Sequence, residues 1–329
     1  MSDFPLVSII TPTYNHKNFI GTCIESVLRQ SFDAWEQIII DDGSIDGTNE
    51  IIKTYKDSRI RFINQNHRGI WHLSEAYNTA LKLARGEFIA ILEGDDFWPA
   101  DKLEKQIPYF DDAGVILTWG KGIIVDDKNQ VIDEMMPKHF NKYKNIYQNI
   151  PIGIALNRLL FENFIVPTAT IVIRRRSLIE VGGFEQPIGI PFVDYATWLK
   201  LCLRGRFCFI NEVLGFWRRH RLQTSNLFNS EMILGTAEIS SHFLDDLTLD
   251  QRKSYGINTH ELMSMNAYLR GTAYHIKKDY VKSNKEFIKA IIGGYNLIRC
   301  KAFIGLLSNV TGIELFKLIN SIKVKIKII

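Results

Sequence analysis

Short apolar runs alternate with helical repeats over the first 125 residues of the chain. Four runs have the composition of buried strands: Val7–Thr11, Gln37–Ile40, Arg59–Asn64 and Glu87–Leu92. Between them, apolar residues recur with helical spacing over residues 19–28 and 73–84, and a further helix is predicted to begin near Asp46 or Thr48. Strands that alternate with helices predict an α/β fold, in which crossover helices join parallel strands.

The pattern becomes less regular after residue 114. Strands are predicted at Val115–Thr118, Ile123–Val125, Ala169–Ile173 and Phe207–Ile210, with a turn at Asp126–Asn129, an irregular segment over Met135–Asn163 and a helix over Phe192–Leu203. From Asn229 onward the signals are helical only. We therefore predict a mixed sheet flanked by helices in residues 1–228 and a helical C-terminal region in residues 229–329.

Polar clusters follow three of the predicted strands at their carboxyl ends: Thr11–Asn15, Asp41–Ser44 and Glu93–Asp96. Ligands of open α/β sheets bind outside these ends, so the clusters are expected to meet in one crevice. Glu93, Asp95 and Asp96 place three carboxylates within four residues. A divalent cation stabilises such crowded like charges, and a diphosphate suits its remaining positions. The cluster therefore predicts metal-assisted chemistry on a phosphorylated substrate.

Composition narrows the class of protein. The chain has 329 residues, of which 46% are hydrophobic, and its net charge of only +4 gives no reason to expect a nucleic-acid partner. Its four cysteines form no CxxC pair and are predicted to be reduced. Neither a signal peptide nor an apolar stretch of about 18 residues is recognisable. These features predict a cytoplasmic protein without a spanning helix.

A series of short motifs follows in a characteristic order: Val7–Asn15, Ile38–Thr48, Asn66–Gly69, Ala76–Asn78, Ala84–Phe88, Glu93–Asp96, Val181–Phe184, Val193–Trp198 and Trp217–His220. Each motif alone is weak, but their order and spacing over residues 6–225 closely resemble family 2 glycosyltransferases with the GT-A fold, of the bacterial surface-polysaccharide type. The resemblance implies an enzyme that takes a sugar from a nucleotide-diphospho-sugar.

The resemblance assigns the nucleotide base to the first two polar clusters. Pro12 and Tyr14 offer a cyclic and a flat surface for the base, and the carboxylate of Asp42 would accept a hydrogen bond from its ring N–H. That acceptor favours uracil without excluding thymine, so a UDP-sugar is the predicted donor. Taken alone, Asp41–Ser44 is also typical of a turn that caps the next helix.

In the acidic cluster, the resemblance assigns Asp96 to the metal, Mn²⁺ or Mg²⁺, and Asp95 to the ribose or the sugar of the donor. The cation would neutralise the diphosphate as it leaves. Glu93 is assigned to the donor site as well, although the family usually has the shorter aspartate there. A solvated acidic loop is the alternative interpretation of the cluster by itself.

Asp194 corresponds to the catalytic base of inverting transferases, which deprotonates the acceptor hydroxyl. The family commonly has Glu-Asp here, whereas this chain has Val193 before the aspartate. His220 corresponds to a histidine that approaches the metal or the diphosphate, and Arg68 is a further donor-site candidate. Plainer interpretations exist for both regions, a helix N-terminus for Asp194 and a solvated basic face for Arg218–Arg221.

The C-terminal region has two features. Ala267–Tyr274, with Phe287 and Ala290, resembles a single tetratricopeptide-like helical hairpin in which the small residues let two helices approach closely, and a plain helical pair is the alternative. Leu315–Ile329 places apolar residues along one helical face with lysines between them, which predicts contact with an anionic membrane surface. A terminal strand, a packed tail and a disordered tail are the alternatives for this segment.

The sequence therefore predicts a metal-dependent inverting glycosyltransferase. Its predicted donor is a UDP-sugar, and its predicted acceptor is a glycan or a polyprenyl-linked oligosaccharide at the inner face of the cell membrane. The residues at Glu93 and Val193 leave one alternative, an inactive nucleotide-fold scaffold that works through its helical tail. A dinucleotide-dependent oxidoreductase is excluded, because Thr11–Asn15 follows the first strand where a glycine-rich turn would be needed.

Overall fold

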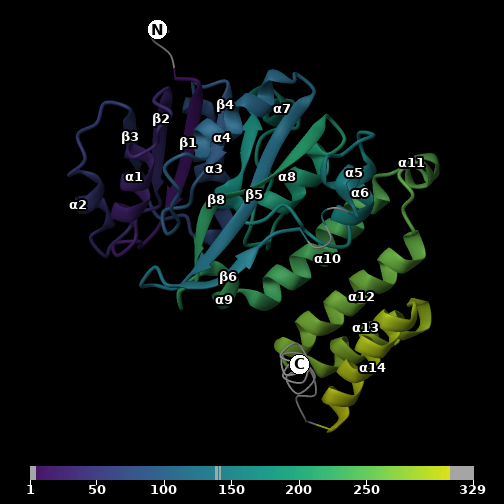
Figure 1. Cartoon of the computed structure of the whole chain (residues 1–329). Coiled ribbons are helices and arrows are strands. Elements are labelled where there is room, and N and C mark those ends of the chain that lie inside the picture. The colour runs from purple at the N-terminus through teal and green to yellow at the C-terminus, as the bar shows by residue number, and fades with distance from the viewer. Residues whose placement is uncertain (1–4, 138–139, 141, 312–329) are drawn as a thin grey trace. The chain divides into compact units, whose positions relative to one another are not determined.

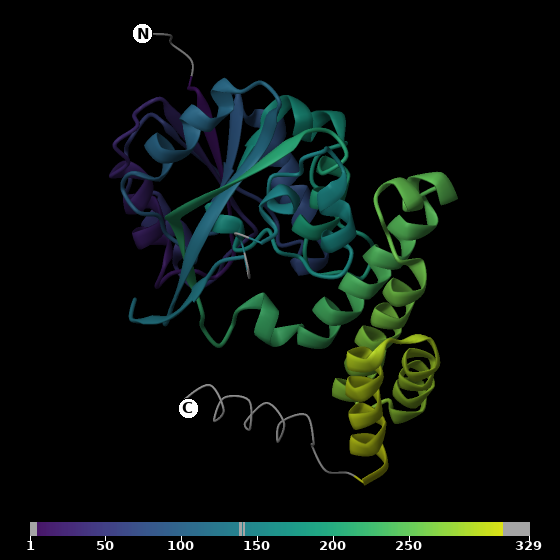
Figure 2. The same cartoon turned by 45° about the vertical axis from the view of Figure 1, so that its right-hand side comes forward.

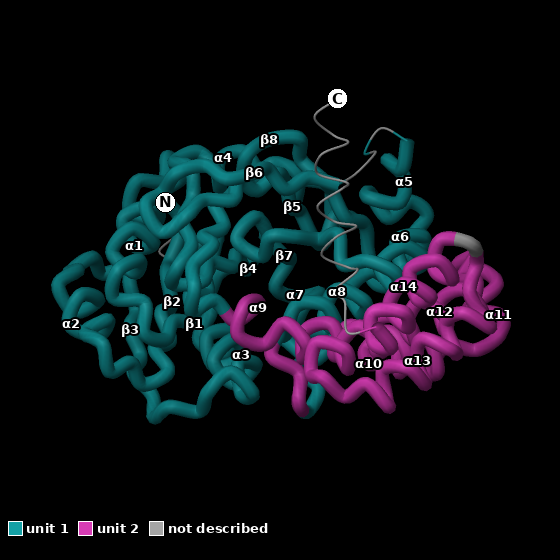
Figure 3. Tube along the Cα trace, turned by 90° about the horizontal axis from the view of Figure 1, so that it is seen from below, with its two compact units in different colours: residues 1–188, 192–223 teal, residues 189–191, 224–329 magenta. Residues whose placement is uncertain are grey.

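The computed structural model describes residues 5–137, 140 and 142–311. The chain divides into two compact units (Figures 1 and 3). The first comprises the residues up to 188 together with residues 192–223, and the second comprises residues 189–191 and the residues from 224 onward. The boundary predicted from the sequence lies between residues 228 and 229.

Eight strands of the described residues form one mixed sheet in the first unit. They are β1 (Val7–Thr13), β2 (Trp35–Asp41), β3 (Ile60–Asn64), β4 (Phe88–Ile91), β5 (Val115–Val125), β6 (Val131–Met135), β7 (Val172–Arg174) and β8 (Arg206–Arg218). The order across the sheet is β3-β2-β1-β4-β7-β5-β6, and β8 pairs with β5 (Figure 1). Strands β1 to β4 run parallel, whereas β7 is antiparallel to β4 and β5. This mixed sheet confirms the predicted fold class.

Helices cover both faces of the parallel strands. The described helices of this unit are α1 (Ile20–Leu28), α2 (Thr48–Ile52), α3 (Leu73–Leu83), α4 (Lys102–Gln106), α5 (Lys144–Tyr147), α6 (Ile154–Leu159), α7 (Arg175–Glu180) and α8 (Asp194–Leu201). Cys23, Ile24 and Val27 recur at helical spacing on α1 and are fully buried against Ile9 and Ile39. Side chains alternate along a strand, so the intervening strand residues point to the other face, where α3 packs on β1 and β2.

The strands β5 and β8 are longer than predicted, and they pair as parallel neighbours (Figure 2). Gly120 and Gly122 interrupt the apolar pattern of β5, but a Cβ at these positions would lie 2.5 Å from Leu214 and 2.4 Å from Pro167. Residues 211–212 of β8 are polar and interrupt its apolar pattern. A prediction from apolar periodicity stops at such interruptions and does not detect close packing around glycine, so both strands are longer than predicted.

Two further segments differ from their predictions. The segment Met135–Asn163, predicted to be irregular, contains α5 and α6. The strand predicted at Ala169–Ile173 begins only at Val172, after a 3₁₀ turn at Thr168–Thr170. In this turn the hydroxyl of Thr170 donates to the carbonyl of Pro167 at 2.8 Å. Such a local bond competes with strand pairing and is invisible to apolar periodicity.

The second unit is built from helices in its described residues: α9 (Thr224–Leu227), α10 (Asn229–Asp245), α11 (Leu249–Ser254), α12 (Thr259–Ile276), α13 (Tyr280–Gly293) and α14 (Asn296–Thr311). Phe287 of α13 is fully buried at the centre of its apolar cluster. A Cβ on Gly271 of α12 would lie 2.6 Å from this ring, and one on Gly305 of α14 would lie 2.4 Å from it. The close approach predicted at Gly271 is therefore present, and a third helix shares it.

The tail Leu315–Ile329, for which contact with a membrane was predicted, lies outside the described residues. None of the helices in the described part of the chain is long and apolar enough to cross a membrane. The four cysteines form no disulfide in the structure; Cys23 and Cys202 are buried, whereas Cys300 lies exposed on α14 and is not a core residue.

Replacing Phe287 by alanine should destabilise the helical unit by about 3–5 kcal/mol, because the cavity would open between three helices at once. Hydrogen–deuterium exchange over residues 259–311 should then accelerate. Ile288→Ala is the matched control, since the neighbouring Ile288 is 46% exposed and should change exchange little. Equal exchange in the two variants would show that Phe287 is not the centre of this core.

Candidate active site

The three polar clusters meet at the carboxyl ends of the parallel strands, as predicted. The backbone N–H of Asn15 donates to the hydroxyl of Ser44 at 2.8 Å, which joins the loop after β1 to the loop after β2. The N–H of Gly94 donates to the carbonyl of Pro12 at 3.0 Å, which joins the acidic loop after β4 to the end of β1. Parallel pairing of β1 with both neighbours sets the three loops side by side.

Glycine at position 94 allows the acidic loop to press against the end of β1. A Cβ on Gly94 would lie 2.4 Å from the hydroxyl oxygen of Thr13 and 3.0 Å from Nδ1 of His16. Any larger residue would push the loop away from the strand. The neighbouring Asp95 is therefore held close to His16.

Three side chains at this end of the sheet form a group that could hold a metal ion. Their potential ligand atoms, from His16, Asp95 and His220, all lie within 4.8 Å of one another. His220 Nε2 is 3.0 Å from the Asp95 carboxylate, and only 9% and 13% of these two side chains are exposed. The sequence singled out His220 and Asp95 but missed His16. Its position directly after the first polar cluster could have identified it, because a histidine at a ligand-binding strand end is a candidate metal ligand.

The electrostatics of this group favour the forms that bind a metal. Burial opposes ionisation of Asp95, but His16 and His220 outweigh it and lower the pKa of that carboxyl. Burial lowers the pKa of His16 as well, although the charge of Asp95 acts against the shift. An ionised carboxylate beside a neutral imidazole is the donor state that a metal requires. The residues present therefore fit a divalent cation.

Asp96, predicted as the metal ligand, does not belong to this group. Its side chain is 2% exposed and accepts a hydrogen bond from the backbone N–H of Arg218 at 2.8 Å. Burial raises its pKa well above the usual value, and the charges of Asp95 and Glu93 add to this shift. The structure thus brings Asp95, and not Asp96, to the pair of histidines.

Arg218, at the end of β8, holds the acidic loop in place. Its Nε donates to the carbonyl of Asp95 at 2.7 Å, and its Nη1 donates to the carbonyl of Asp126 and to the side chain of Asn129. The guanidinium also lies 4.7 Å from the ring centre of Phe19. The side chain is 1% exposed, so Arg218 supports the loop from inside the protein and is not placed to bind a phosphate.

Glu93 is bonded to α3. The hydroxyl of Tyr77 donates to its Oε1 at 2.6 Å. Burial raises the pKa of Glu93 to about 7; the Tyr77 hydrogen bond opposes the shift and the charge of Asp95 adds to it. Glu93 was assigned to the donor site by resemblance, and in the structure one of its oxygens is already held by Tyr77.

Asp42 organises the loop that follows β3. Its Oδ1 accepts from Gln65 Nε2 at 2.8 Å and from the N–H of Arg68 at 3.0 Å. Its Oδ2 accepts from the N–H of Gly69 at 2.8 Å and lies 3.0 Å from Nδ1 of His67. Asp42 therefore accepts hydrogen bonds from the protein itself in this structure, and its role toward a nucleotide base stays a prediction.

Tyr14 presents the flat surface that was predicted beside Asp42. Its ring is 37% exposed and stacks on the ring of His67, with centroids 4.2 Å apart and an interplanar angle of 22°. Pro12 is buried in β1, where its carbonyl anchors the acidic loop. Arg68 is exposed, and its guanidinium bonds to Glu75 at 3.0 Å.

Asp194 lies in the first turn of α8. Asn163 Nδ2, which the sequence did not single out, donates to its carboxylate at 2.9 Å. Burial raises the pKa of Asp194, although hydrogen bonds from the Tyr195 backbone and from Asn163 act against the shift. The charge of Asp194 acts on the hydroxyl of Tyr77 together with those of the acidic loop, so these carboxyl groups share one region.

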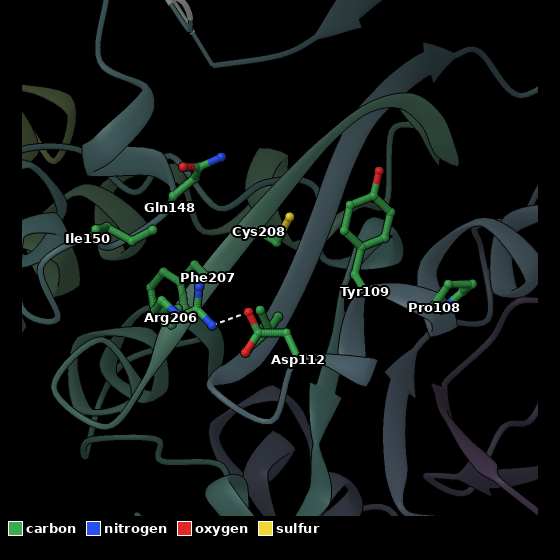
Figure 4. A pocket seen from close by; sticks show the side chains of 9 residues that line it. Pro108, Tyr109, Asp112, Gln148, Ile150, Arg206, Phe207 and Cys208 are labelled. Carbon is green, nitrogen blue, oxygen red and sulfur yellow. Dashed lines mark hydrogen bonds and ion pairs between the residues drawn. The ribbon is translucent and has the colours of Figure 1, made fainter.

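A separate pocket of about 330 Å³ contains none of the predicted site residues (Figure 4). It is lined in part by Val115 and Arg206, which begin β5 and β8. Because β5 runs in the same direction as β4, this is the end of the sheet opposite to the acidic loop. The pocket is therefore not the candidate active site.

A family model described as Glycosyl transferase family 2 matches residues 8–182, which include the three polar clusters and Tyr77. The chain belongs to this family. It is a glycosyltransferase, and the resemblance recognised from the sequence is confirmed.

Curated relatives of this family 2 glycosyltransferase support the assignment. The chain is 32% identical over 220 residues to TuaG of Bacillus subtilis, whose name assigns it to teichuronic acid biosynthesis, and the match spans 65% of this chain and 79% of TuaG. It is 32% identical over 236 residues to WfgD of Escherichia coli, named a UDP-Glc:alpha-D-GlcNAc-diphosphoundecaprenol beta-1,3-glucosyltransferase, with 70% and 82% coverage.

Solved structures of two glycosyltransferases share the GT-A fold. TarS 1-349 of S. aureus in complex with UDP-GlcNAc aligns with a TM-score of 0.55 at 17% identity, over 88% of this chain and 92% of TarS. The mannosyltransferase PcManGT of Pyrobaculum calidifontis, in complex with GDP-Man and Mn²⁺, aligns with a TM-score of 0.58 at 18% identity, over 94% and 88%. At these identities the likeness shows the fold alone.

Replacing Arg218 by lysine should destabilise the first unit and weaken binding of nucleotide. Lysine cannot reproduce the fork of donors, so buried carbonyls at Asp95 and Asp126 would lose their partners at about 1–3 kcal/mol each. Thermal unfolding and UDP titration measure the two effects. Arg221→Lys is the control, because Arg221 is exposed. An Arg218→Lys variant with unchanged melting and UDP affinity would contradict this role.

Proposed function

We propose that the chain is a metal-dependent inverting glycosyltransferase that moves a sugar from a UDP-sugar to a hydroxyl of a glycan or polyprenyl-linked oligosaccharide during surface-polysaccharide synthesis. One observation carries the proposal. The group formed by His16, Asp95 and His220 lies on loops joined by hydrogen bonds to the loop that presents Asp42. Asp194 begins α8 and acts electrostatically on Tyr77, whose hydroxyl donates to Glu93 of the acidic loop. We infer that a diphosphate-binding cation would lie between a base-binding candidate and a candidate general base.

The donor proposal rests on the chemistry of the first two clusters. The carboxylate of Asp42 can accept from a ring N–H, and the exposed ring of Tyr14 suits a planar base. In the structure His67 stacks on one side of that ring, and both carboxylate oxygens of Asp42 accept hydrogen bonds from the loop after β3. Binding of uracil would therefore replace contacts that this loop makes within the protein. The UDP-GlcNAc complex of the similar fold TarS and the name of WfgD are consistent with a UDP-linked donor.

The proposed mechanism assigns one task to each group. Asp95 and His220, with their donor atoms 3.0 Å apart, would hold the cation, which supplies positive charge to the leaving diphosphate. Asp194 would accept the proton of the acceptor hydroxyl as that oxygen attacks the anomeric carbon. Asn163 donates to Asp194 and fixes the direction of the carboxylate. A single displacement of this kind inverts the anomeric configuration, because the nucleophile enters opposite the leaving group.

The proposed location is the cytoplasmic face of the cell membrane, where a polyprenyl-linked acceptor would be accessible. The lysines and apolar residues of Leu315–Ile329 are the sequence feature that supports peripheral contact there. The inactive-scaffold alternative is weaker, because the carboxylates of Asp95 and Asp194 are both retained and positioned.

Slow hydrolysis of the donor tests the enzyme proposal without knowledge of the acceptor. With Mn²⁺, the full chain should release UDP from at least one UDP-sugar in a screen that also includes GDP- and dTDP-sugars. Removal of the metal by a chelator should abolish release, because the diphosphate then leaves with its charge uncompensated. Absence of release from every nucleotide sugar would favour the scaffold, and release from GDP-sugars alone would overturn the UDP assignment.

Replacing Asp194 by asparagine should lower turnover by about 10²–10⁴-fold while UDP affinity stays unchanged, because only the proton acceptor is lost. In the wild type, the raised pKa of Asp194 should move the acid limb of kcat/KM above the usual aspartate range, since the base must be ionised. Asp111→Asn is the matched control at an exposed aspartate. Full activity of Asp194→Asn would rule out Asp194 as the base.

A further inference from the structure

We propose that His16 is a third protein ligand of the cation, so that His16, Asp95 and His220 hold a first-row transition ion before the nucleotide arrives and prefer it to Mg²⁺. The inference deepens the metal dependence proposed above and rests on it. It concerns a residue that neither the sequence motifs nor the family resemblance assigned to the metal. Under this proposal the cation stays bound to the protein and does not enter together with the donor.

The distances within the group are close to those of a chelate. Ligands about 2.1 Å from one ion lie roughly 3–3.5 Å from each other. The Asp95 and His220 atoms are already 3.0 Å apart, and all three ligand atoms lie within 4.8 Å of one another. The three ligand atoms are therefore close enough to be gathered around one ion.

The backbone and a hydrogen bond hold His16 at this position. Its carbonyl accepts from the N–H groups of Phe19 and Ile20 at 2.9 and 2.8 Å, so it is fixed to the start of α1. The hydroxyl of Thr13 lies 3.1 Å from its Nδ1. Metal-bound histidines are commonly oriented by such a second partner, because it sets the tautomer and the plane of the ring. The ring of His16 also packs edge-on against the ring of His220, with centroids 6.2 Å apart.

Asp95 is the acid of this loop that faces the two histidines. The other two acids have partners of their own, because the hydroxyl of Tyr77 donates to Glu93 and the backbone N–H of Arg218 donates to Asp96. The Asp95 carboxylate and the two imidazoles therefore form the donor set to which a cation would bind.

The donor set determines which ion is preferred. Mg²⁺ favours oxygen ligands and water, and it loses its hydration shell reluctantly. Imidazole nitrogens instead favour the first-row transition ions, with affinity rising from Mn²⁺ toward Co²⁺ and beyond. Two imidazoles and one carboxylate hold an ion through the protein alone. A site with a single carboxylate would depend on the diphosphate for the rest of its ligands.

The test is metal binding to the full chain in the absence of nucleotide. Calorimetric titration with Mn²⁺, supported by the paramagnetic resonance signal of free Mn²⁺, should show one site in the wild type. His16→Ala should weaken that site by at least about tenfold and reduce the preference for Mn²⁺ over Mg²⁺. Co²⁺ bound to the wild type should give a visible absorption spectrum that changes in His16→Ala. His242→Ala, at an exposed histidine of α10, is the matched control.

The outcomes separate this inference from the proposed function. Equal Mn²⁺ affinity and equal Co²⁺ spectra in the wild type and His16→Ala would overturn the role of His16. The same conclusion would follow if the wild type bound no Mn²⁺ without UDP, even if Mn²⁺-dependent hydrolysis persisted. His16→Gln, which keeps a polar group beside Thr13, repeats the test with less disturbance of the fold. Circular dichroism must match the wild type for a loss of affinity to count.

Discussion

The repulsion between carboxyl groups at the end of β4 is the constraint on which the rest of the site depends. Glu93, Asp95 and Asp96 leave the strand within four residues, and each is stabilised in a different way. Tyr77 donates to Glu93, the backbone of Arg218 donates to Asp96, and two histidines surround Asp95. Because Glu93 and Asp96 are bonded to other groups, only the Asp95 carboxylate faces the two histidines. A cation bound between these three side chains would neutralise its charge.

This division of the acids requires a strand from the far end of the domain. Arg218 and His220 lie more than a hundred residues after the acidic loop, and the length of β8 carries them back to it. Strand β8 pairs with β5 from Arg206 to Arg218, with shifts of register near Gly120, and this pairing connects its two ends. The glycines of β5 matter for the site for the same reason, since Gly120 lets Leu214 of β8 pack directly on the strand.

The residues proposed for the donor and for the acceptor are held differently. On the donor side, Asp42 and Tyr14 belong to loops joined to each other by many local hydrogen bonds, and their present partners, Gln65 and His67, come from the loop that the base would meet. On the acceptor side, Asp194 sits on α8 and is directed by Asn163. In the proposed function, the loop after β3 would exchange its own contacts for those of the donor, while Asn163 keeps the proposed base oriented toward the acceptor.

Periodicity and strand-end chemistry were sufficient to predict much of this protein. The parallel strands β1 to β4 and the helices α1 and α3 follow from the apolar pattern within each element. The meeting of Pro12, Asp42 and Asp95 follows from the polar cluster that comes directly after each strand of a parallel sheet. Other features could not be predicted this way. The full extents of β5 and β8 depend on glycines packed against Leu214 and Pro167, and such contacts leave no periodic signal.

The sequence by itself determined the fold class, the family and the set of carboxylates and histidines from which a site could be made. Only the tertiary structure decided how they are divided, placing Asp95 rather than Asp96 with the histidines and adding His16 to them. The physical reason is that neighbours in sequence on an irregular loop point in different directions. Which of them meets a cation depends on partners brought by distant strands.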